Sequence, residues 1–141
     1  MDSLRSDGRD DNETASYDAE GVAQLETIWG EGFMSPGGPA EVGRIVAGVP
    51  IAGCDVLDIG CGTGGAALVL AAEHRARSVT GIDVESYVAR EATKRVADRG
   101  ESERVRFRRV PPGPLPFPDR SSDVEFSKDT IIHIALKTLK E

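Results

Sequence analysis

The stretch of sequence that decides the fold is Asp55-Val56-Leu57-Asp58-Ile59-Gly60-Cys61-Gly62-Thr63-Gly64-Gly65. A short apolar run leads into closely spaced glycines, and strong helix formers follow over residues 66–72, so we predict a strand, a tight turn and a helix. Glycines let a ligand approach the backbone of such a turn, and the first turn of the helix presents free N–H groups. We therefore expect a nucleotide-like ligand there. The alternative is a turn whose glycines serve chain geometry alone.

The same alternation of strands and helices extends along the chain in both directions. Periodicity predicts helices over 17–29, 39–49, 87–99 and 130–140, of which the first two carry the apolar stripes Val22, Leu25, Ile28, Trp29 and Val42, Ile45, Val46, Val49. Apolar runs predict further strands over 78–83, 105–110 and 123–127. Right-handed crossovers then give an α/β fold with a mostly parallel, doubly wound sheet. Glu125, inside the last strand, must be exposed or paired.

Length and charge exclude several function classes. The chain has 141 residues, enough for one domain, with a polar, acidic leader over 1–14 that we expect to be disordered and a folded domain over 15–141. A net charge of −7, from 24 acidic and 17 basic residues, disfavours nucleic acid as a partner. No run approaches the roughly 18 apolar residues of a membrane span and no signal peptide opens the chain, so we expect a cytoplasmic protein that does not bind membranes.

The cysteines do not suggest a metal site. Cys54 and Cys61 lack the Cys-x-x-Cys spacing, and the chain offers only His74 and His133 to join them. We therefore expect no bound metal.

The glycines and a later aspartate point to an adenosine ligand. Gly60, Gly62 and Gly65 satisfy the pattern G-x-G-x-x-G of dinucleotide-binding turns, a weak signal by itself. Asp83 ends the next predicted strand, about twenty residues further on, where a carboxylate can accept both hydroxyls of a ribose. NAD enzymes share this placement, so a nicotinamide cofactor stays open, as does a capping or solvated role for Asp83.

Asp58 changes the balance between the cofactors. The order Asp-x-Gly-x-Gly-x-Gly over residues 58–64 resembles motif I of the class I S-adenosylmethionine-dependent methyltransferases. The methionine carboxylate of that cofactor can use a helix N-terminus, and its ammonium favours nearby carboxylates. The cofactor contacts that we expect from this resemblance are Asp58, Gly60, Cys61, Gly62, Gly64, Asp83 and Val84.

Separated segments of the chain are similar to the phosphoethanolamine N-methyltransferases in a single register. The similar segments are 17–22, 28–38 (Ile-Trp-Gly-Glu-Gly-Phe-Met-Ser-Pro-Gly-Gly), 81–83, 117–119 and 127–134 (Ser-Lys-Asp-Thr-Ile-Ile-His-Ile). The resemblance implies methyl transfer from S-adenosylmethionine to the amine of a small substrate, foremost phosphoethanolamine or a methylated phosphobase.

The resemblance also assigns roles to residues outside the glycine turn. Tyr17 and His133 match a tyrosine and a histidine that face each other over the substrate, and Asp129 matches an aspartate that approaches its amine. Met34 and Ser35 match residues over the methionine end of the cofactor. Taken singly, Tyr17 could be a packing residue, His133 a satisfied histidine and Asp129 a helix N-cap.

The chain departs from the family pattern in two places. The stretch Val110-Pro111-Pro112 stands where such methyltransferases usually offer an aspartate to the adenine. The family's sheet has seven strands, so the expected fold is a Rossmann-like sheet truncated after the fourth strand, in a domain incomplete at its C-terminus. An unpaired parallel edge of this kind favours self-association.

Three hypotheses follow. The first is the cofactor-binding half of an N-methyltransferase, for a phosphobase or for another small amine such as sarcosine or dimethylglycine. The second is a noncatalytic S-adenosylmethionine-binding module or pseudoenzyme. The third, which Asp58 argues against, is a nicotinamide-binding fragment.

Overall fold

The computed structural model describes residues 18–34 and 37–128, and its centre is a parallel sheet. The strands are β1 (Asp55–Ile59), β2 (Ser78–Asp83), β3 (Val105–Arg109) and β4 (Val124–Phe126). They lie in the order β3-β2-β1-β4, and every neighbouring pair is parallel. The predicted α/β fold with a parallel sheet is confirmed, and the strand bounds differ from the predicted ones by one residue at most.

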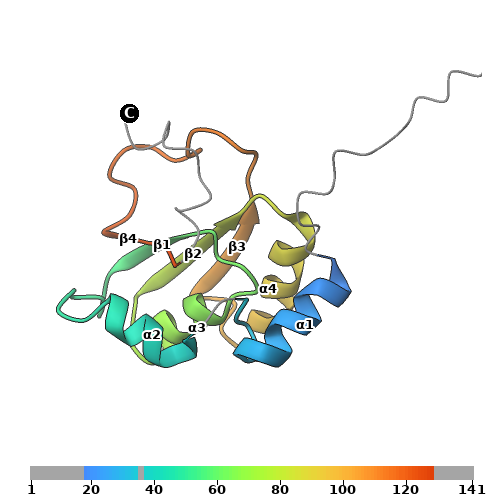
Figure 1. Cartoon of the computed structure of the whole chain (residues 1–141). Coiled ribbons are helices and arrows are strands. Elements are labelled where there is room, and N and C mark those ends of the chain that lie inside the picture. The colour runs from blue at the N-terminus through green and yellow to red at the C-terminus, as the bar shows by residue number, and fades with distance from the viewer. Residues whose placement is uncertain (1–17, 35–36, 129–141) are drawn as a thin grey trace, which may run out of the picture.

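Four helices lie together on one side of this sheet in Figure 1. They are α1 (Ala19–Trp29), α2 (Gly38–Ile45), α3 (Gly65–Ala72) and α4 (Ser86–Asp98), and of these α3 and α4 pack directly on the strands. Asp18 caps α1 by accepting a hydrogen bond from the Gly21 N–H at 2.8 Å. The strand order explains the one-sided arrangement, because β1, β2 and β3 follow one another in the same direction and right-handed crossovers then place α3 and α4 on the same face.

The direction of winding reverses at β4, which pairs with the other side of β1. The connection over residues 110–123 accordingly passes on the side of the sheet opposite to the helices (Figure 1). The carboxyl ends of β1 and β4 therefore form a topological switch point, which is where open α/β sheets bind their ligands.

Apolar side chains cover both faces of the sheet. On the helix side the core includes Val56, Val79 and Val105, one from each of three strands and each 1% exposed. On the other side Phe117, from the proline-rich connection, packs against a smaller cluster formed by Leu57, Ile82 and Val110. This contact lets a segment without helix or strand shield the second face, and the Arg108 guanidinium lies 5.4 Å from the Phe117 ring centre.

The predicted helical stripes are wrong in part. In the second helix Val42 and Val46 are buried, but Ile45 and Val49 are 40% and 43% exposed, and α2 ends at Ile45 instead of 49. The reason is that α2 packs mainly on α3, so only a narrow face is covered, and Gly48 has a φ of +79° that a continuing helix does not allow.

The apolar stripe of the first helix is also only partly buried. Val22 is the buried residue of α1, whereas Ile28 and Trp29 are 64% and 39% exposed. Glu125 is exposed, as its place in β4 required. The predicted leader over 1–14 and the predicted helix over 130–140 lie outside the described residues. Within the described ranges, no helix combines the length and apolar character needed to span a membrane.

Candidate cofactor site

The glycine turn follows β1 at the switch point, and three of its glycines have left-handed backbone conformations. Their φ angles are +73° at Gly60, +54° at Gly62 and +93° at Gly64. Residues with a β-carbon rarely adopt such angles, which explains the glycine at each position. The Gly60 and Cys61 N–H groups both donate to the Ile82 carbonyl, at 2.8 and 3.0 Å, so the turn is tied to the end of β2.

Asp83 joins the two loops at the carboxyl ends of β1 and β2. Its Oδ2 accepts a hydrogen bond from the Gly62 N–H at 3.2 Å, and its Oδ1 accepts one from the Glu85 N–H at 3.0 Å. Each carboxylate oxygen can accept a second hydrogen bond. Asp83 is thus oriented by the backbone and retains capacity for two donors, such as the vicinal hydroxyls of a ribose.

Asp58 is the most unusual group of the site. It is 1% exposed, and its Oδ2 has no hydrogen-bond partner among the described residues. Burial raises the pKa of Asp58 to about 7, and the nearby charge of Asp83 adds to the rise. Because buried polar atoms are almost always hydrogen-bonded, this carboxyl marks a position for a donor from a ligand or a water molecule.

Thr63 is a site residue that the sequence reasoning missed. It is fully buried in the glycine turn, and its hydroxyl also lacks a partner within the described part of the chain. Asp58 and Thr63 are the two buried side chains with such an unpartnered oxygen in the described residues, and both belong to the strand and turn that were predicted to meet a ligand. A threonine between glycines carries no sequence signal for this, since its burial depends on packing from distant elements.

Cys61 lies with its side chain inside the fold. It is 5% exposed, and a β-carbon placed on Gly81 would lie 2.8 Å from its Cβ, so the side chain packs toward β2. Burial and the carboxylates of Asp58 and Asp83 raise the pKa of the Cys61 thiol far above its usual range. The thiol is therefore neutral, and a contact with a ligand falls to the backbone of this residue.

Met34 lies beside the glycine turn. A β-carbon on Gly62 would lie 3.5 Å from the Met34 Sδ, so the segment after α1 reaches over the turn. Val84 follows Asp83 and is 44% exposed, and its carbonyl accepts a hydrogen bond from the Arg109 Nε at 3.2 Å. These positions bring the expected contacts Met34, Asp58, Asp83 and Val84 to one end of the sheet.

The other predicted site residues cannot be placed in the same way. Ser35, Tyr17, Asp129 and His133 lie outside the described residues. In the described ranges no group of three or more His, Cys, Asp or Glu side chains could hold a metal ion.

Comparison with known proteins agrees with this geometry. Residues 56–141 match the family described as a methyltransferase domain, and the chain belongs to that family. It is 33% identical to phosphoethanolamine N-methyltransferase 1 of Arabidopsis thaliana over 123 residues, and 30% identical to phosphoethanolamine N-methyltransferase of Plasmodium falciparum over 126 residues. These alignments include 86% and 89% of this chain but 24% and 46% of the two relatives, so the chain spans less than half the length of either.

A solved relative supports the same family. The chain matches Haemonchus contortus phosphoethanolamine N-methyltransferase 2 in complex with S-adenosyl-L-methionine with a TM-score of 0.78 and 32% identity, over 86% of this chain and 28% of that one. The predicted resemblance to phosphoethanolamine N-methyltransferases is confirmed, and so is S-adenosylmethionine as the cofactor of such relatives.

Proposed function

We propose that this chain binds S-adenosylmethionine and forms the cofactor-binding part of an N-methyltransferase for a small amine, foremost phosphoethanolamine or a methylated phosphobase. The observation that carries the proposal is the buried carboxyl of Asp58, whose Oδ2 has no partner among the described residues, beside a glycine turn that Asp83 anchors. Membership of the methyltransferase family and the names of its relatives support the reaction class and the substrate class.

The described residues offer a partner for each polar part of the cofactor. Asp83 would accept the ribose hydroxyls, and the N–H groups in the first turn of α3 that follow Gly65, whose own N–H donates to the Gly32 carbonyl, would bind the methionine carboxylate. Asp58 would accept from the ammonium group, which removes the cost of its missing hydrogen bond. Met34 and Ser35 would cover the methionine end, and Val84 would contact the nucleoside beside Asp83. When bound, the cofactor supplies an electrophilic methyl group on a sulfonium sulfur.

For methyl transfer, the protein must align the amine with the methyl group and remove a proton from the amine. The amine lone pair forms the N–C bond while the C–S bond breaks, and the electron pair of that bond stays on sulfur. We propose that His133 accepts the amine proton, since the pKa of histidine lies near neutrality. Asp129 would stabilise the growing positive charge on nitrogen, and Tyr17 would meet His133 to close the site. Alignment of nitrogen, carbon and sulfur supplies much of the acceleration.

Calorimetry with three ligands tests the cofactor assignment. We expect S-adenosylmethionine and S-adenosylhomocysteine to bind with micromolar Kd values and NAD to give no heat of binding. Binding of NAD without binding of the other two would overturn the proposal and favour a nicotinamide site.

A methyl-transfer assay tests the reaction and the substrate. Radiolabelled S-adenosylmethionine is incubated with phosphoethanolamine, phosphomonomethylethanolamine, sarcosine and dimethylglycine in parallel. We expect label on the phosphobases, and His133→Ala to lower turnover without changing the cofactor Kd. Cofactor binding without transfer to any of the four amines would identify a noncatalytic binding module, whereas transfer to sarcosine alone would correct the substrate.

A further inference from the structure

Arg95 links three parts of the chain that meet at the cofactor site. It lies on α4, and its side chain is only 13% exposed. Its Nη2 lies 2.7 Å from the Glu26 Oε2 on α1, its Nε lies 3.4 Å from the Glu31 Oε1, and its Nη1 donates to the Thr63 carbonyl in the glycine turn. A single guanidinium thus connects α1, the segment after it and the turn.

Backbone hydrogen bonds complete the connection between the same segments. The Glu26 Oε2 also accepts from the Gly32 N–H at 3.1 Å, and the Gly32 carbonyl accepts from the Gly65 N–H at 2.9 Å. The two glycines touch so closely that a β-carbon on Gly65 would lie 2.5 Å from the Gly32 carbonyl oxygen. The turn and the segment after α1 are therefore held against each other, with Arg95 spanning both.

This arrangement sets the distance between two sides of the proposed site. The glycine turn forms one side, and Met34, two residues beyond Gly32, forms the other. Gly32 is fixed to the first residue of α3 through Gly65 and to Arg95 through Glu26, so the guanidinium contacts hold the segment that carries Met34.

We propose that Arg95 is a positioning residue that sets the spacing of Met34 over the glycine turn, and through that spacing the affinity for S-adenosylmethionine. The inference rests on the proposed function. Lysine cannot replace arginine here, since its single ammonium lacks the planar set of donors that reaches two carboxylates and a carbonyl at once. Glu26, with 17% of its side chain exposed, is the partner that the buried guanidinium requires.

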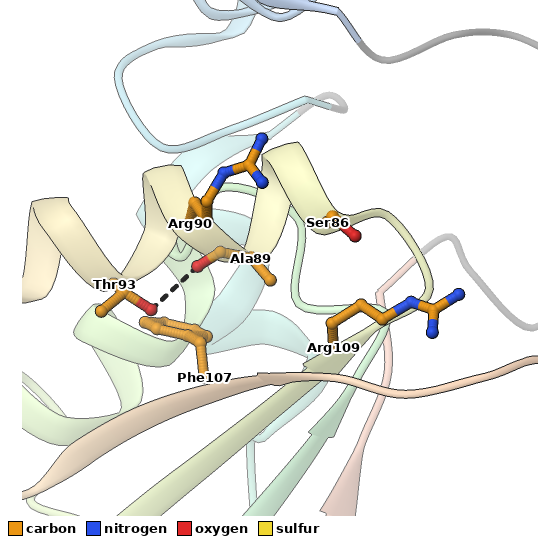
Figure 2. Close-up of a pocket in the computed structure, with 6 residues that line it drawn as sticks. All are labelled: Ser86, Ala89, Arg90, Thr93, Phe107 and Arg109. Atoms are coloured by element: carbon orange, nitrogen blue, oxygen red, sulfur yellow. Dashed lines mark hydrogen bonds between the residues drawn. The ribbon is translucent and has the colours of Figure 1, made fainter.

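The test compares variants of Arg95 with a matched control on the same helix. Arg90 is exposed, and Figure 2 shows its guanidinium directed away from the Phe107 ring in a shallow pocket that also includes Ser86 and Thr93. Cofactor Kd is measured by calorimetry well below the unfolding temperature for wild type, Arg95→Lys, Glu26→Gln and Arg90→Lys. We expect Kd to rise about tenfold in the first two variants, as for loss of a charge-assisted hydrogen bond, and to stay within about twofold of wild type in the third.

A double-mutant cycle separates positioning from a general loss of stability. If Arg95 acts through Met34, Met34→Ala weakens binding in wild type but has little further effect in Arg95→Lys. Arg90→Lys with Met34→Ala serves as the additive control. Trp29, the single tryptophan, reports by its fluorescence whether each variant is folded and whether the end of α1 has moved.

The outcomes distinguish this inference from the proposed function. If wild type does not bind S-adenosylmethionine, the proposed function fails. If wild type binds but the folded Arg95→Lys and Glu26→Gln variants keep its Kd, or if Met34→Ala and Arg95→Lys are additive, the inference about Arg95 is wrong while the proposed function stands. Should Arg95→Lys not fold, Glu26→Gln carries the same prediction, because it removes the same charge pair from the other side.

Discussion

The two aspartates of β1 lie three residues apart, Asp55 at the first position of the strand and Asp58 at the last but one, and their surroundings differ. Asp55, at the amino end, accepts hydrogen bonds from Arg77 at 2.9 and 2.6 Å and from the Ser78 hydroxyl at 2.7 Å. These hydrogen bonds, above all those from Arg77, lower the pKa of Asp55 to about 2. Asp58 is buried, its Oδ2 has no partner in the described chain, and burial raises its pKa to about 7. Identical side chains on one strand thus have opposite charge preferences.

This difference distinguishes the two ends of the sheet: the amino ends of the strands carry structural contacts, and the carboxyl ends carry the proposed binding site. At the amino end Asp123 forms two hydrogen bonds with the Asp55 backbone. Its Oδ2 accepts one from the Asp55 N–H at 2.8 Å, and its own N–H donates one to the Asp55 carbonyl at 2.9 Å. These contacts fasten β4 to β1. At the carboxyl end polar groups are left available, as a binding site requires. Along β1, the paired carboxylate of Asp55 stabilises the fold, whereas the Asp58 carboxyl, with an oxygen that has no partner in the described chain, offers a place for a ligand.

The largest expected effect comes from replacing the titratable carboxyl of Asp58, near the carboxyl end of β1. In the protein without cofactor, Asp58→Asn should abolish a pH dependence of stability. The folded-state pKa of Asp58 lies above its ordinary value of 3.8, so the stability that this group contributes is complete below about pH 4 and is lost as the pH rises toward 7. The loss is on the order of 1 kcal/mol per pH unit. Urea unfolding of both proteins at pH 5, 6 and 7 measures it, and parallel profiles would contradict the assignment.

Asp83→Ala should produce the largest loss of cofactor binding. The variant removes the acceptor for the ribose hydroxyls and also frees the Gly62 N–H. Losing charge-assisted hydrogen bonds predicts that the Kd for S-adenosylmethionine rises about 100-fold. Calorimetry measures this Kd, and Asp123→Ala, at the opposite end of the strands, is the control. An unchanged Kd in Asp83→Ala would refute the ribose assignment.

A pair of glycine substitutions sharpens the comparison between the two ends. Gly62 and Gly53 have φ angles of +54° and +74°, so alanine at either position should cost about 1–2 kcal/mol of stability through backbone strain. At Gly53 the new β-carbon meets nothing within 4 Å, whereas at Gly62 it lies in van der Waals contact with the Met34 sulfur at 3.5 Å, in the space proposed for the cofactor. We therefore expect both variants to unfold at lower urea concentration and only Gly62→Ala to raise the cofactor Kd. Equal Kd values for the two variants would argue against Met34 as part of the site.

The smallest expected effect on cofactor binding comes from a substitution at the amino end of β1. Arg77→Ala should leave the cofactor Kd within about twofold of wild type, because its contacts are exposed and lie at the far end of β1. The variant should instead change how stability depends on pH in acid. In the wild type, the ion pair of Asp55 stabilises the fold above about pH 4, and that contribution is lost as the pH falls toward 2. Acid unfolding curves should show that Arg77→Ala loses less stability between about pH 4 and pH 2 than the wild type does. A tenfold change in the cofactor Kd would contradict the distinction between a structural and a binding end of the sheet.

Sequence patterns predicted the elements better than their contacts. The strand over 78–83 has the predicted bounds, and α4 spans Ser86–Asp98 where a helix over 87–99 was predicted. The stripe of α2 failed because periodicity shows which residues share a face but not how much of that face a neighbour covers. Tyr17, Asp129 and His133 remain predictions from resemblance.

The sequence by itself determined the alternation of strands and helices, the glycine turn and the aspartate that ends β2, because these depend on local backbone preferences and short-range periodicity. Tertiary structure decided that Asp55 is paired while the Asp58 Oδ2 has no partner in the described part of the chain, and that Arg95 reaches the Thr63 carbonyl from 32 residues away. Burial and hydrogen bonding arise when distant segments pack together, and no local pattern in the chain encodes which polar groups that packing leaves unsatisfied.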